Sequence, residues 1–550
     1  MKLPYPVVPF ALVLATGLSS CGGSDDNAVD PVGNVQNIVV IYGENRSFDN
    51  LYGDFPGAHG LSEVVDASGK PTPAYVPQKD RDGSTVLATL PATWGGVTAA
   101  GATPVVTQAQ SLGLANAPFS IETAYTASSG VTLDANTVTR DLYHRFFENQ
   151  MQVNGGKNDM YAAWADAGGL TMGHYTTAKS ALYALAQQYT LADNFFQGAW
   201  GGSFLNHQYL ICACAPEYPN ADTAAAKPTI AVLDKDAAGN FLPRLTIAAG
   251  SPPSAADGAA KFALSGNIAP LNYLGDNKFY AVNTMQAAYQ PSGNAPAAAA
   301  SGAGLLYADT TRATTLPAQS ATNIGDLLTA KGVGWKWYAG AWNAALTDGM
   351  QASTVTRAAI YTPSVPRGSP DFQPHHQPFN YYAAFDPVAH AADRTAHLQD
   401  YTDLVADAAA GKLPPVSFFK PQGNLNQHEG YANIADGDAH IADLVAKLQA
   451  SPQWKNMLIV ITYDEFGGVY DHVPPPKGDK IGPGTRIPAI IISPLAKKGY
   501  VDHTQYDTAS VLRFITRRWG LTTLPGLASR DAALKSSGAT AMGDLSAALQ

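Results

Sequence analysis

The sequence is poor in cysteine and in charged residues. Among 550 residues there are 3 cysteines, and 14% of the residues carry a charge. With so few cysteines, the fold cannot rest on a disulfide framework. Cys212 and Cys214 are separated by one alanine, which is closer than most disulfides allow, so we expect two small buried apolar side chains there; a strained bridge, formed because the chain is exported, is the alternative.

Positive charge and long apolar segments are also scarce. The 34 lysines and arginines are outnumbered by 44 acidic residues, which gives a formal net charge of −10. An acidic chain without a strip of basic and aromatic residues is not a binder of nucleic acid or another polyanion. Beyond the N-terminus no segment is long and apolar enough to cross a membrane, and there is no internal repeat.

The N-terminus has the pattern of an export signal. A short apolar stretch from Val7 to Ala15 is followed by small residues, which predicts a cleavable signal peptide over residues 1–20. The Leu-Ser-Ser-Cys sequence ending at Cys21 resembles a bacterial lipobox, in which Cys21 would carry the lipid; an ordinary secretory signal with an incidental cysteine is the alternative. Residues 21–34 would form a flexible tether. We therefore expect an exported bacterial lipoprotein in the periplasm, at the outer membrane or on the cell surface, held to the membrane by its N-terminal anchor.

Two apolar segments of strand length end in acidic residues. Residues 37–43 lead directly into Glu44 and Asn45, and residues 457–463 lead into Asp464 and Glu465. In α/β proteins, ligands bind at the carboxyl ends of the strands, so these two segments predict a shared metal site. The alternative is that each segment is a buried strand followed by a solvated acidic residue.

The rest of the chain alternates between helical and extended patterns, apart from two regions rich in Gly, Ala and Pro. These regions, at about 60–135 and 215–320, predict loop-rich insertions, of which the second is either a lid or a passive surface segment. Elsewhere we expect helices at 140–150, 178–189, 324–331, 391–411 and 509–519, and strands at 334–339, 416–420 and 487–493. A further helix is expected after Asp438 and before Pro452, with an apolar stripe of Ile441, Leu444, Val445 and Leu448 that lies on the sheet. Such alternation predicts an α/β fold, a mostly parallel central sheet flanked by helices, in a single domain over 35–550.

Three motifs in combination resemble those of the bacterial phosphoesterase family that holds phospholipases C and type-A acid phosphatases, a relative of the alkaline phosphatase superfamily. The resemblance covers nearly the whole mature chain and implies an alkaline-phosphatase-like core. The motifs are Glu44-Asn45-Arg46-Ser47-Phe48-Asp49, Gly201-Gly202-Ser203-Phe204-Leu205-Asn206-His207, and Asp464-Glu465-Phe466-Gly467-Gly468 with Asp471-His472.

The resemblance implies that Ser203 is a nucleophile and that a cation is held by the side chains of Glu44, Asn45, Ser203, Asp464 and Glu465. A serine hydroxyl is a weak nucleophile until a metal or a base activates it, and the cation would provide this activation. A donor set made of oxygens favours Ca²⁺, Mg²⁺ or Mn²⁺. A zinc centre is the less natural alternative and would use histidines as ligands, for which His428, His472 and His503 are available.

The family motifs also match histidines. The resemblance implies that His144, His376 and His428 contact the phosphoryl oxygens and protonate the leaving group, which suits an acidic optimum. The choice of His376 over His375 is open. The remaining candidates could equally support the structure: His207, which shares a helix face with Ser203 if that segment is helical, Asp471 and His472. We expect the other histidines to be exposed or to cap helices; these are His59, His174, His390, His397 and His440.

The residue at the nucleophile position separates the branches of the family. A serine there resembles the acid phosphatase branch, whereas phospholipases C of the phosphocholine type resemble a threonine-bearing motif. We therefore expect an acid phosphatase that hydrolyses phosphomonoesters through a phosphoserine. A phospholipase C that cleaves phospholipid diesters is the alternative. A non-catalytic surface lipoprotein ranks third, because every site position carries a chemically competent side chain.

Overall fold

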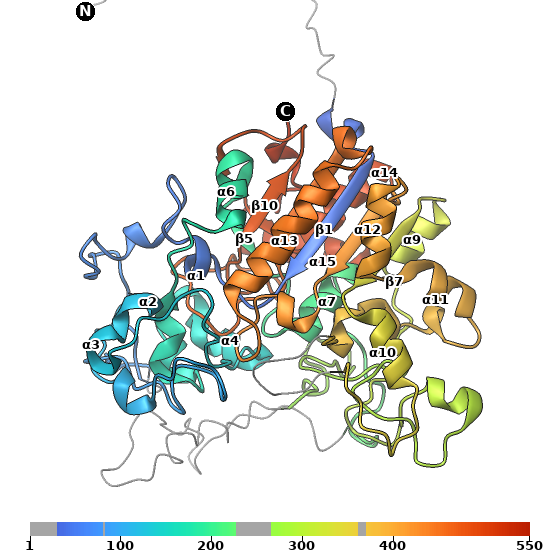
Figure 1. Ribbon diagram of the computed structural model, residues 1–550, viewed down its shortest axis with the longest axis horizontal. Helices are drawn as coiled ribbons and strands as arrows, with labels where there is room; N and C mark the ends of the chain where they lie inside the picture. Colours follow the sequence, from blue (N-terminus) through green and yellow to red (C-terminus); the bar gives the residue numbers. More distant parts are fainter. Residues whose placement is uncertain (1–29, 81–82, 227–265, 361–369) are drawn as a thin grey trace, which may run out of the picture.

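The computed structural model of the protein describes residues 30–80, 83–226, 266–360 and 370–550. The predicted signal peptide, Cys21 and most of the predicted tether lie outside the described residues, as does part of the 215–320 segment. In the described ranges, no helix combines the length and the apolar character needed to span a bilayer. Figure 1 shows the chain coloured from its blue N-terminus to its red C-terminus.

The core of the protein is an eight-stranded sheet that contains strands from both ends of the chain. The N-terminal strand β1 lies between two strands from the C-terminal half, which Figure 1 shows as a blue arrow among orange ones. All neighbouring pairs are parallel except those of β10, which runs antiparallel to both its neighbours. In sheet order the strands are β11 (Tyr500–Asp502), β4 (Thr190–Ala192), β10 (Ala489–Ile492), β9 (Met457–Tyr463), β1 (Asn37–Gly43), β8 (Val416–Lys420), β6 (Trp335–Ala339) and β7 (Leu398–Asp400). The predicted mostly parallel α/β fold is confirmed.

The central strands are mostly apolar because helices cover both faces of the sheet. Every residue of β1 and β9 is buried. Figure 1 shows α12 (Tyr401–Ala409) and α13 (Ile434–Gln449) in front of the sheet, and α14 (Ala509–Trp519) and α15 (Pro525–Ser537) behind it. The predicted apolar stripe of α13 is buried, and it comprises Ile441, Leu444, Val445 and Leu448.

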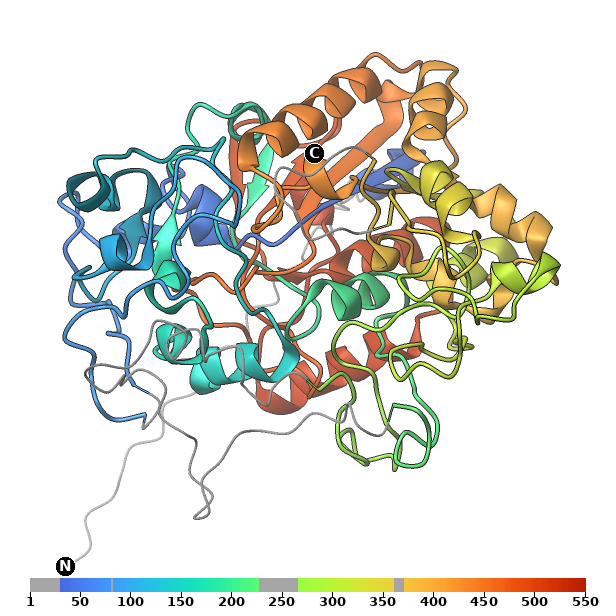
Figure 2. The ribbon, with the colours of Figure 1, turned by 60° about the horizontal axis from the view of Figure 1, so that its bottom comes forward.

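The remaining elements are shorter and surround the two ends of the sheet. Figure 2, in which the bottom of the view in Figure 1 comes forward, shows how much of this region is loop. Two pairs of short strands lie apart from the main sheet: β2 (Phe119–Ser120) with β3 (Gly173–His174), and β5 (Phe195–Phe196) with β12 (Tyr506–Asp507). The other helices are α1 (Phe48–Tyr52), α2 (Ile121–Ala124), α3 (Thr126–Ser129), α4 (Phe146–Val153), α5 (Tyr161–Trp164), α6 (Ala181–Gln188), α7 (Ser203–Cys212), α9 (Ile324–Ala330), α10 (Trp342–Gly349) and α11 (Ala391–His397).

Three local expectations are wrong. The helix expected at 391–411 is interrupted by the edge strand β7, because Asp400 caps the start of α12 by accepting a hydrogen bond from the Thr402 backbone N–H. The helix expected at 140–150 begins only at Phe146. Cys212 and Cys214 form a disulfide: α7 ends at Cys212, and Ala213 has a left-handed backbone with φ 51°, which brings the two Cα atoms to 5.1 Å.

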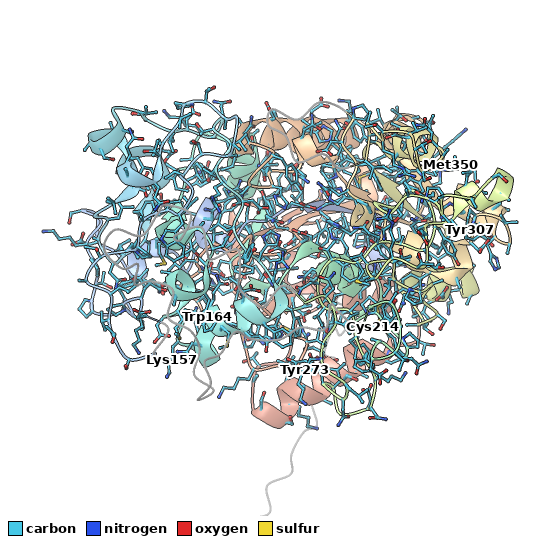
Figure 3. The ribbon with its side chains drawn as sticks, turned by 90° about the horizontal axis from the view of Figure 1, so that it is seen from below. Lys157, Trp164, Cys214, Tyr273, Tyr307 and Met350 are labelled. Carbon is cyan, nitrogen blue, oxygen red and sulfur yellow. A yellow bond between two sulfur atoms is a disulfide. The ribbon has the colours of Figure 1, made fainter. Side chains whose placement is uncertain are left out.

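The carboxyl ends of the parallel strands meet at one end of the molecule. Segments that carry Trp164, Cys214, Tyr273 and Tyr307 lie at that end, and Figure 3 views it from below.

Candidate active site

The two acidic motifs meet at the carboxyl end of the sheet. β1 and β9 pair in register up to Gly43 opposite Tyr463, so the next residues of both strands emerge side by side. The Asp464 backbone N–H donates to Gly43 O at 3.1 Å, and the Asn45 backbone N–H donates to Asp464 Oδ1 at 3.1 Å. Asn45 adopts a left-handed backbone with φ 60°, which asparagine tolerates better than most residues. The structure therefore brings these motifs together, as the sequence predicts.

Ser203 reaches the same place from the first turn of α7. The preceding Gly201 has φ +79°, and a Cβ there would lie 2.3 Å from the Phe146 backbone nitrogen. A Cβ on Gly202 would lie 2.8 Å from the His144 carbonyl oxygen. Only glycines allow the turn to pack this closely against the segment that carries His144.

The Ser203 hydroxyl lies between an amide and a carboxylate. Its Oγ is 3.3 Å from Asn45 Oδ1 and 3.3 Å from Glu465 Oε1. Ser203 also begins a ten-residue helix, whose free backbone N–H groups and dipole favour a negatively charged group at this end. The hydroxyl is thus placed to attack an anion held at the start of α7.

Lys420 is a site residue that the sequence analysis missed. It ends β8, the strand next to β1, and its side chain is fully buried. Lys420 Nζ lies 3.0 Å from Glu44 Oε1 and donates to Gly43 O at 3.1 Å. The sequence feature that could have pointed to Lys420 is a lysine at the last position of an apolar strand. Only the strand order shows that its partner is Glu44.

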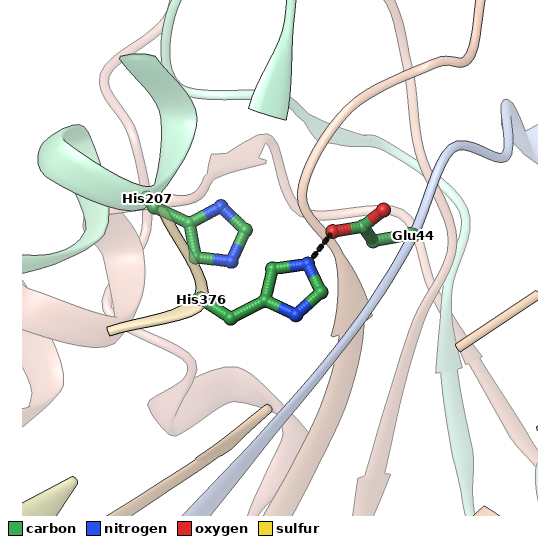
Figure 4. Close-up of side chains that lie close together, drawn as sticks. All are labelled: Glu44, His207 and His376. Atoms are coloured by element: carbon green, nitrogen blue, oxygen red, sulfur yellow. Dashed lines mark hydrogen bonds and ion pairs between the residues drawn. The ribbon is translucent and has the colours of Figure 1, made fainter. Parts of the chain in front are cut away.

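Two stacked histidines lie beside Glu44. His376 Nε2 is 2.5 Å from Glu44 Oε1, and the His207 ring stacks on the His376 ring with centroids 5.6 Å apart, as Figure 4 shows. His207 Nδ1 bonds to the Ser203 carbonyl one helical turn before it at 2.7 Å, which confirms that the two residues share a face of α7. In the described residues, His207 Nε2 and His376 Nδ1 are buried without hydrogen-bond partners.

His144 and His428 lie on the other side of Ser203. His144 Nδ1 bonds to the Leu142 carbonyl at 2.6 Å, and its Nε2 is 3.6 Å from Glu465 Oε1. His428 Nε2 accepts from Asn45 Nδ2 at 2.9 Å, while its Nδ1 bonds to the Glu429 carbonyl. Each ring therefore has Nδ1 on a backbone carbonyl and Nε2 turned to the site. Burial lowers the pKa of His144 to about 4 and that of His428 to about 3.

Arg46 positions His428 rather than substrate. Its guanidinium donates to the Gln427 carbonyl at 3.0 and 2.6 Å and pairs with Glu429 at 2.6 Å. Arg46 is buried, so it is held within the protein and fixes the loop on both sides of His428.

The site contains more buried negative charge than its own cations balance. Glu44, Asp464 and Glu465 are fully buried. Burial raises the pKa of Asp464 to about 7 and the pKa of Glu465 well above its ordinary value. Burial alone would also raise the pKa of Glu44, but the charges of Lys420 and His376 bring it well below its ordinary value. Asp464 Oδ2 has no hydrogen-bond partner within the described ranges.

These residues have the chemistry of a divalent-metal site. Carboxylates, an amide oxygen and a hydroxyl converge there, and the buried excess of negative charge is what a bound cation would neutralise. Glu44, His207 and His376 each offer one ligand atom, and these atoms lie within 4.8 Å of one another. The fit is therefore good for oxygen ligands, with imidazole nitrogens beside them.

Three other candidates lie in different clusters. Asp471 accepts from Arg486 Nε at 2.9 Å, and His472 Nδ1 lies 2.7 Å from Asp49 Oδ2. His503 lies 2.9 Å from Asp193. The zinc centre proposed as an alternative would need His472 and His503 beside His428, and the structure does not bring these three residues together.

A cavity of about 750 Å³ opens onto Ser203, and most of its lining is polar. His144, His375 and His428 line it, whereas His376 lies beneath, against Glu44. Two cationic side chains, Arg145 and Arg357, also line it. The uncharged polar residues of the wall are Asn267, Asn283, Thr284, Gln286, Asn294, Thr314 and Gln373.

Among curated proteins, the chain is similar to phospholipases C. It is 32% identical over 146 residues to a non-specific phospholipase C6 of Arabidopsis thaliana, a match that covers 21% of this chain and 28% of that protein. It is 29% identical over 155 residues to phospholipase C B of Mycobacterium tuberculosis, covering 24% of this chain and 30% of that protein. It is 28% identical over 150 residues to a non-hemolytic phospholipase C of Pseudomonas aeruginosa, covering 22% of each. The matched segments span less than a third of these relatives.

Solved structures that resemble the chain include a protein in the alkaline phosphatase superfamily from Vibrio parahaemolyticus. That match has 9% identity and a TM-score of 0.30, and it covers 65% of this chain and 64% of the other. A TM-score this low does not establish a shared fold. The fold is established by the strand order and pairing described above. A sequence model of the family described as Phosphoesterase matches residues 35–522, which is most of the chain. The protein is therefore a member of the Phosphoesterase family.

Proposed function

We propose that the protein hydrolyses phosphomonoesters as an acid phosphatase, through a phosphoserine at Ser203. The observation that carries the proposal is the position of the Ser203 hydroxyl, 3.3 Å from both Asn45 and Glu465 and at the wall of a polar cavity. The hydroxyl attacks phosphorus while the bond from phosphorus to the leaving alcohol oxygen breaks; the serine proton passes to a nearby base and the leaving oxygen takes up a proton. Water then attacks the phosphoserine, which releases phosphate and restores the serine hydroxyl.

A divalent cation in this site would be held by Glu44, Asn45, Ser203, Asp464 and Glu465. When bound, it would lower the pKa of the serine hydroxyl and offset charge on the phosphoryl oxygens. The oxygen donors favour Ca²⁺, Mg²⁺ or Mn²⁺. Zinc is the alternative, and His207 and His376 beside Glu44 are the observation in its favour.

His144 and His428 are the proposed proton carriers for the leaving group. Each has Nδ1 fixed on a backbone carbonyl, so Nε2 is the atom that can carry a proton toward the cavity. In neutral His428 this nitrogen accepts from Asn45 Nδ2, and protonation of the ring would replace that hydrogen bond. Because burial lowers both pKa values, the rings are charged only in acid unless a bound phosphate favours the charged form. His375 is proposed to contact the phosphoryl oxygens, and His376 to orient Glu44.

The lining of the cavity supports a polar leaving group. Amides, hydroxyls and guanidinium groups bind a hydrophilic alcohol well and are costly to cover with an acyl chain. Phospholipase C activity is the second candidate, because the relatives reported above are phospholipases C. A binding lipoprotein without activity remains the third candidate.

We also propose that the protein is exported and anchored by a lipid on Cys21. The support is the sequence alone, with its apolar stretch and the Leu-Ser-Ser-Cys ending. Membrane fractionation of wild type and Cys21→Ala tests it: the wild type should be found with membranes and the variant should be soluble. Equal distribution of the two proteins would contradict lipidation.

The function is tested by hydrolysis of a chromogenic phosphomonoester and of a phosphocholine diester, from about pH 4 to about pH 9. Wild type, Ser203→Ala and the matched control Ser417→Ala are assayed before and after chelation. Ser417 is a buried serine of β8 outside the site. Monoester cleavage in acid that disappears only in Ser203→Ala supports the proposal. Cleavage of the diester alone would select the phospholipase, and no cleavage of either would favour the binding protein.

A further inference from the structure

A second group of metal-binding side chains lies at the edge of the sheet, apart from the active site. Its members are His59, Asp193 and His503, and one ligand atom from each lies within 4.8 Å of the others. Asp193 directly follows β4, and His503 directly follows β11. Because these two strands are parallel, with Asp502 opposite Ala192, Asp193 and His503 emerge side by side. His59 comes from the turn after α1.

The backbone of this cluster is fixed by protein contacts alone. The buried Arg486 donates to the carbonyl oxygens of His59 at 2.7 Å and of Asp193 at 2.8 Å. The His59 backbone N–H donates to Asp193 Oδ2 at 2.8 Å. These bonds hold the three residues close before any ion arrives, which lowers the entropic cost of binding one.

The side chains combine a buried carboxylate with two accessible imidazoles. Asp193 is fully buried, and its one ion pair within the described residues is with His503 Nδ1, at 2.9 Å. The side chains of His59 and His503 are 56% and 52% exposed, and their ring centroids lie 5.0 Å apart. A metal from solvent can thus reach both rings.

A nearby carboxylate completes the arrangement. Glu63 Oε1 lies 2.9 Å from His59 Nδ1. In proteins, an imidazole that binds a metal commonly has a carboxylate or carbonyl on its other nitrogen, which orients the ring. Two imidazoles and a carboxylate suit zinc better than calcium or magnesium, which prefer oxygen ligands.

We infer that His59, Asp193 and His503 form a second metal site that takes zinc, with Glu63 orienting His59. The ion would join the turn after α1 to the edge strands β4 and β11. α1 begins within the motif that carries Glu44 and Asn45, so the ion would also restrain a segment connected to the active site. This role is structural and does not depend on the proposed reaction.

The test is the number of zinc ions bound per chain after equilibrium dialysis of the full-length folded protein against zinc alone. The double variant His59→Ala/His503→Ala should bind one equivalent fewer than the wild type. His390→Ala is the matched control, because His390 is an exposed histidine 3.7 Å from Asp393 outside this cluster. It should bind as many zinc ions as the wild type.

Zinc bound in the active site is separated by repeating the dialysis in an Asp464→Asn background. There too, the double variant should lack one equivalent. If the double variant does not fold, as judged by circular dichroism, His503→Gln should weaken this equivalent at least about tenfold. Equal zinc counts in wild type and double variant, or unchanged affinity in a folded His503→Gln, would overturn the inference.

Discussion

Two groups of buried acids lie near the carboxyl ends of β1 and β9, and they differ in how their charge is balanced. Asp49 and Asp471 share one guanidinium, because Arg486 pairs with both at 2.9 Å, and His472 adds a contact to Asp49. The acids of the active site, Glu44, Asp464 and Glu465, have one lysine or arginine partner within the described residues, Lys420 on Glu44. Their other ionisable contacts are histidines: His376 on Glu44, His144 on Glu465 and His207 on Asp464.

We therefore assign Asp49 and Asp471 to the stability of the fold, and Glu44, Asp464 and Glu465 to the binding of a ligand. Burial would raise the pKa of Asp49, but His472 and Arg486 lower it below its ordinary value. Burial raises the pKa of Asp471 to about 6, with Arg486 opposing the rise, and raises the pKa of Asp464 to about 7. A buried carboxylate that is kept without a cationic partner destabilises the folded protein, so its presence indicates a function that uses the charge.

The largest expected effect comes from removing a charge of the unbalanced group. Asp464→Asn should lower phosphoesterase activity about 10³-fold and remove the equivalent of metal bound in the active site, because it removes a proposed ligand. Hydrolysis rates and metal content by atomic emission measure this. Asp471→Asn is the matched control and should keep its metal. Loss of metal from both variants would remove the distinction between the two groups.

The next effect concerns pH. Because the pKa of Asp464 is raised in the folded state, this carboxyl contributes stability that is fully present below its ordinary pKa and is lost as pH rises toward 7 in the metal-free protein. At 1.36 kcal/mol per pKa unit, this contribution should fall by about 3 kcal/mol between about pH 4 and about pH 7. The buried histidines, whose pKa values are lowered, change the stability in the opposite direction, so urea unfolding after chelation measures the contribution of Asp464 as the difference between wild type and Asp464→Asn.

Two comparisons sharpen the pH prediction. Saturating metal should reduce the loss of stability that Asp464 causes as pH rises, because the ion favours the charged carboxylates. Asp464→Asn should reduce it without metal, because the amide does not titrate in this range. A difference in stability between metal-free wild type and metal-free Asp464→Asn that does not change over this pH range would show that the Asp464 carboxyl is balanced after all.

A substitution in the group formed by Asp49, Asp471 and Arg486 should lower the stability of the protein and leave the bound metal in place. Asp471→Asn removes one of the two carboxylates that face the buried Arg486, and we expect the free energy of unfolding to fall by about 3 kcal/mol. Urea unfolding at neutral pH measures this. A variant as stable as the wild type would show that Asp49 alone satisfies Arg486.

The smallest effect compares two lysines. Lys420→Met removes the buried partner of Glu44 and should cost about 2 kcal/mol in the metal-bound protein, where the ion still faces Glu44. Lys336→Met removes a partly exposed pair with Asp407 and should cost less than about 1 kcal/mol. Thermal unfolding ranks the two variants, and equal losses would contradict the importance assigned to Lys420.

Much of the fold and the ends of two strands were predictable, because apolar segments that end in acids mark buried parallel strands. The strand order was not, and so neither was the meeting of Lys420 with Glu44, since residues far apart in the sequence become neighbours only through the sheet. For the same reason, sequence alone did not single out His59 or Asp193. The Cys212–Cys214 disulfide depends on the left-handed backbone of Ala213, a conformation that an alanine in the sequence does not predict.

The position of neighbouring histidines also needed the structure. His375 lines the cavity, whereas His376 lies on Glu44, a difference that depends on the short helical turn over Pro374–His376. Family motifs could name the pair but not the orientation of each ring.

The central claim is that Ser203 carries the phosphoryl group during turnover, and trapping that intermediate tests it most directly. The protein is mixed with excess phosphomonoester, quenched rapidly in acid and analysed by peptide mass spectrometry. The account predicts one added phosphoryl group on the peptide that contains Ser203, absent in Ser203→Ala and present in Ser417→Ala. Full activity in Ser203→Ala, or a phosphoryl group on another residue, would contradict it.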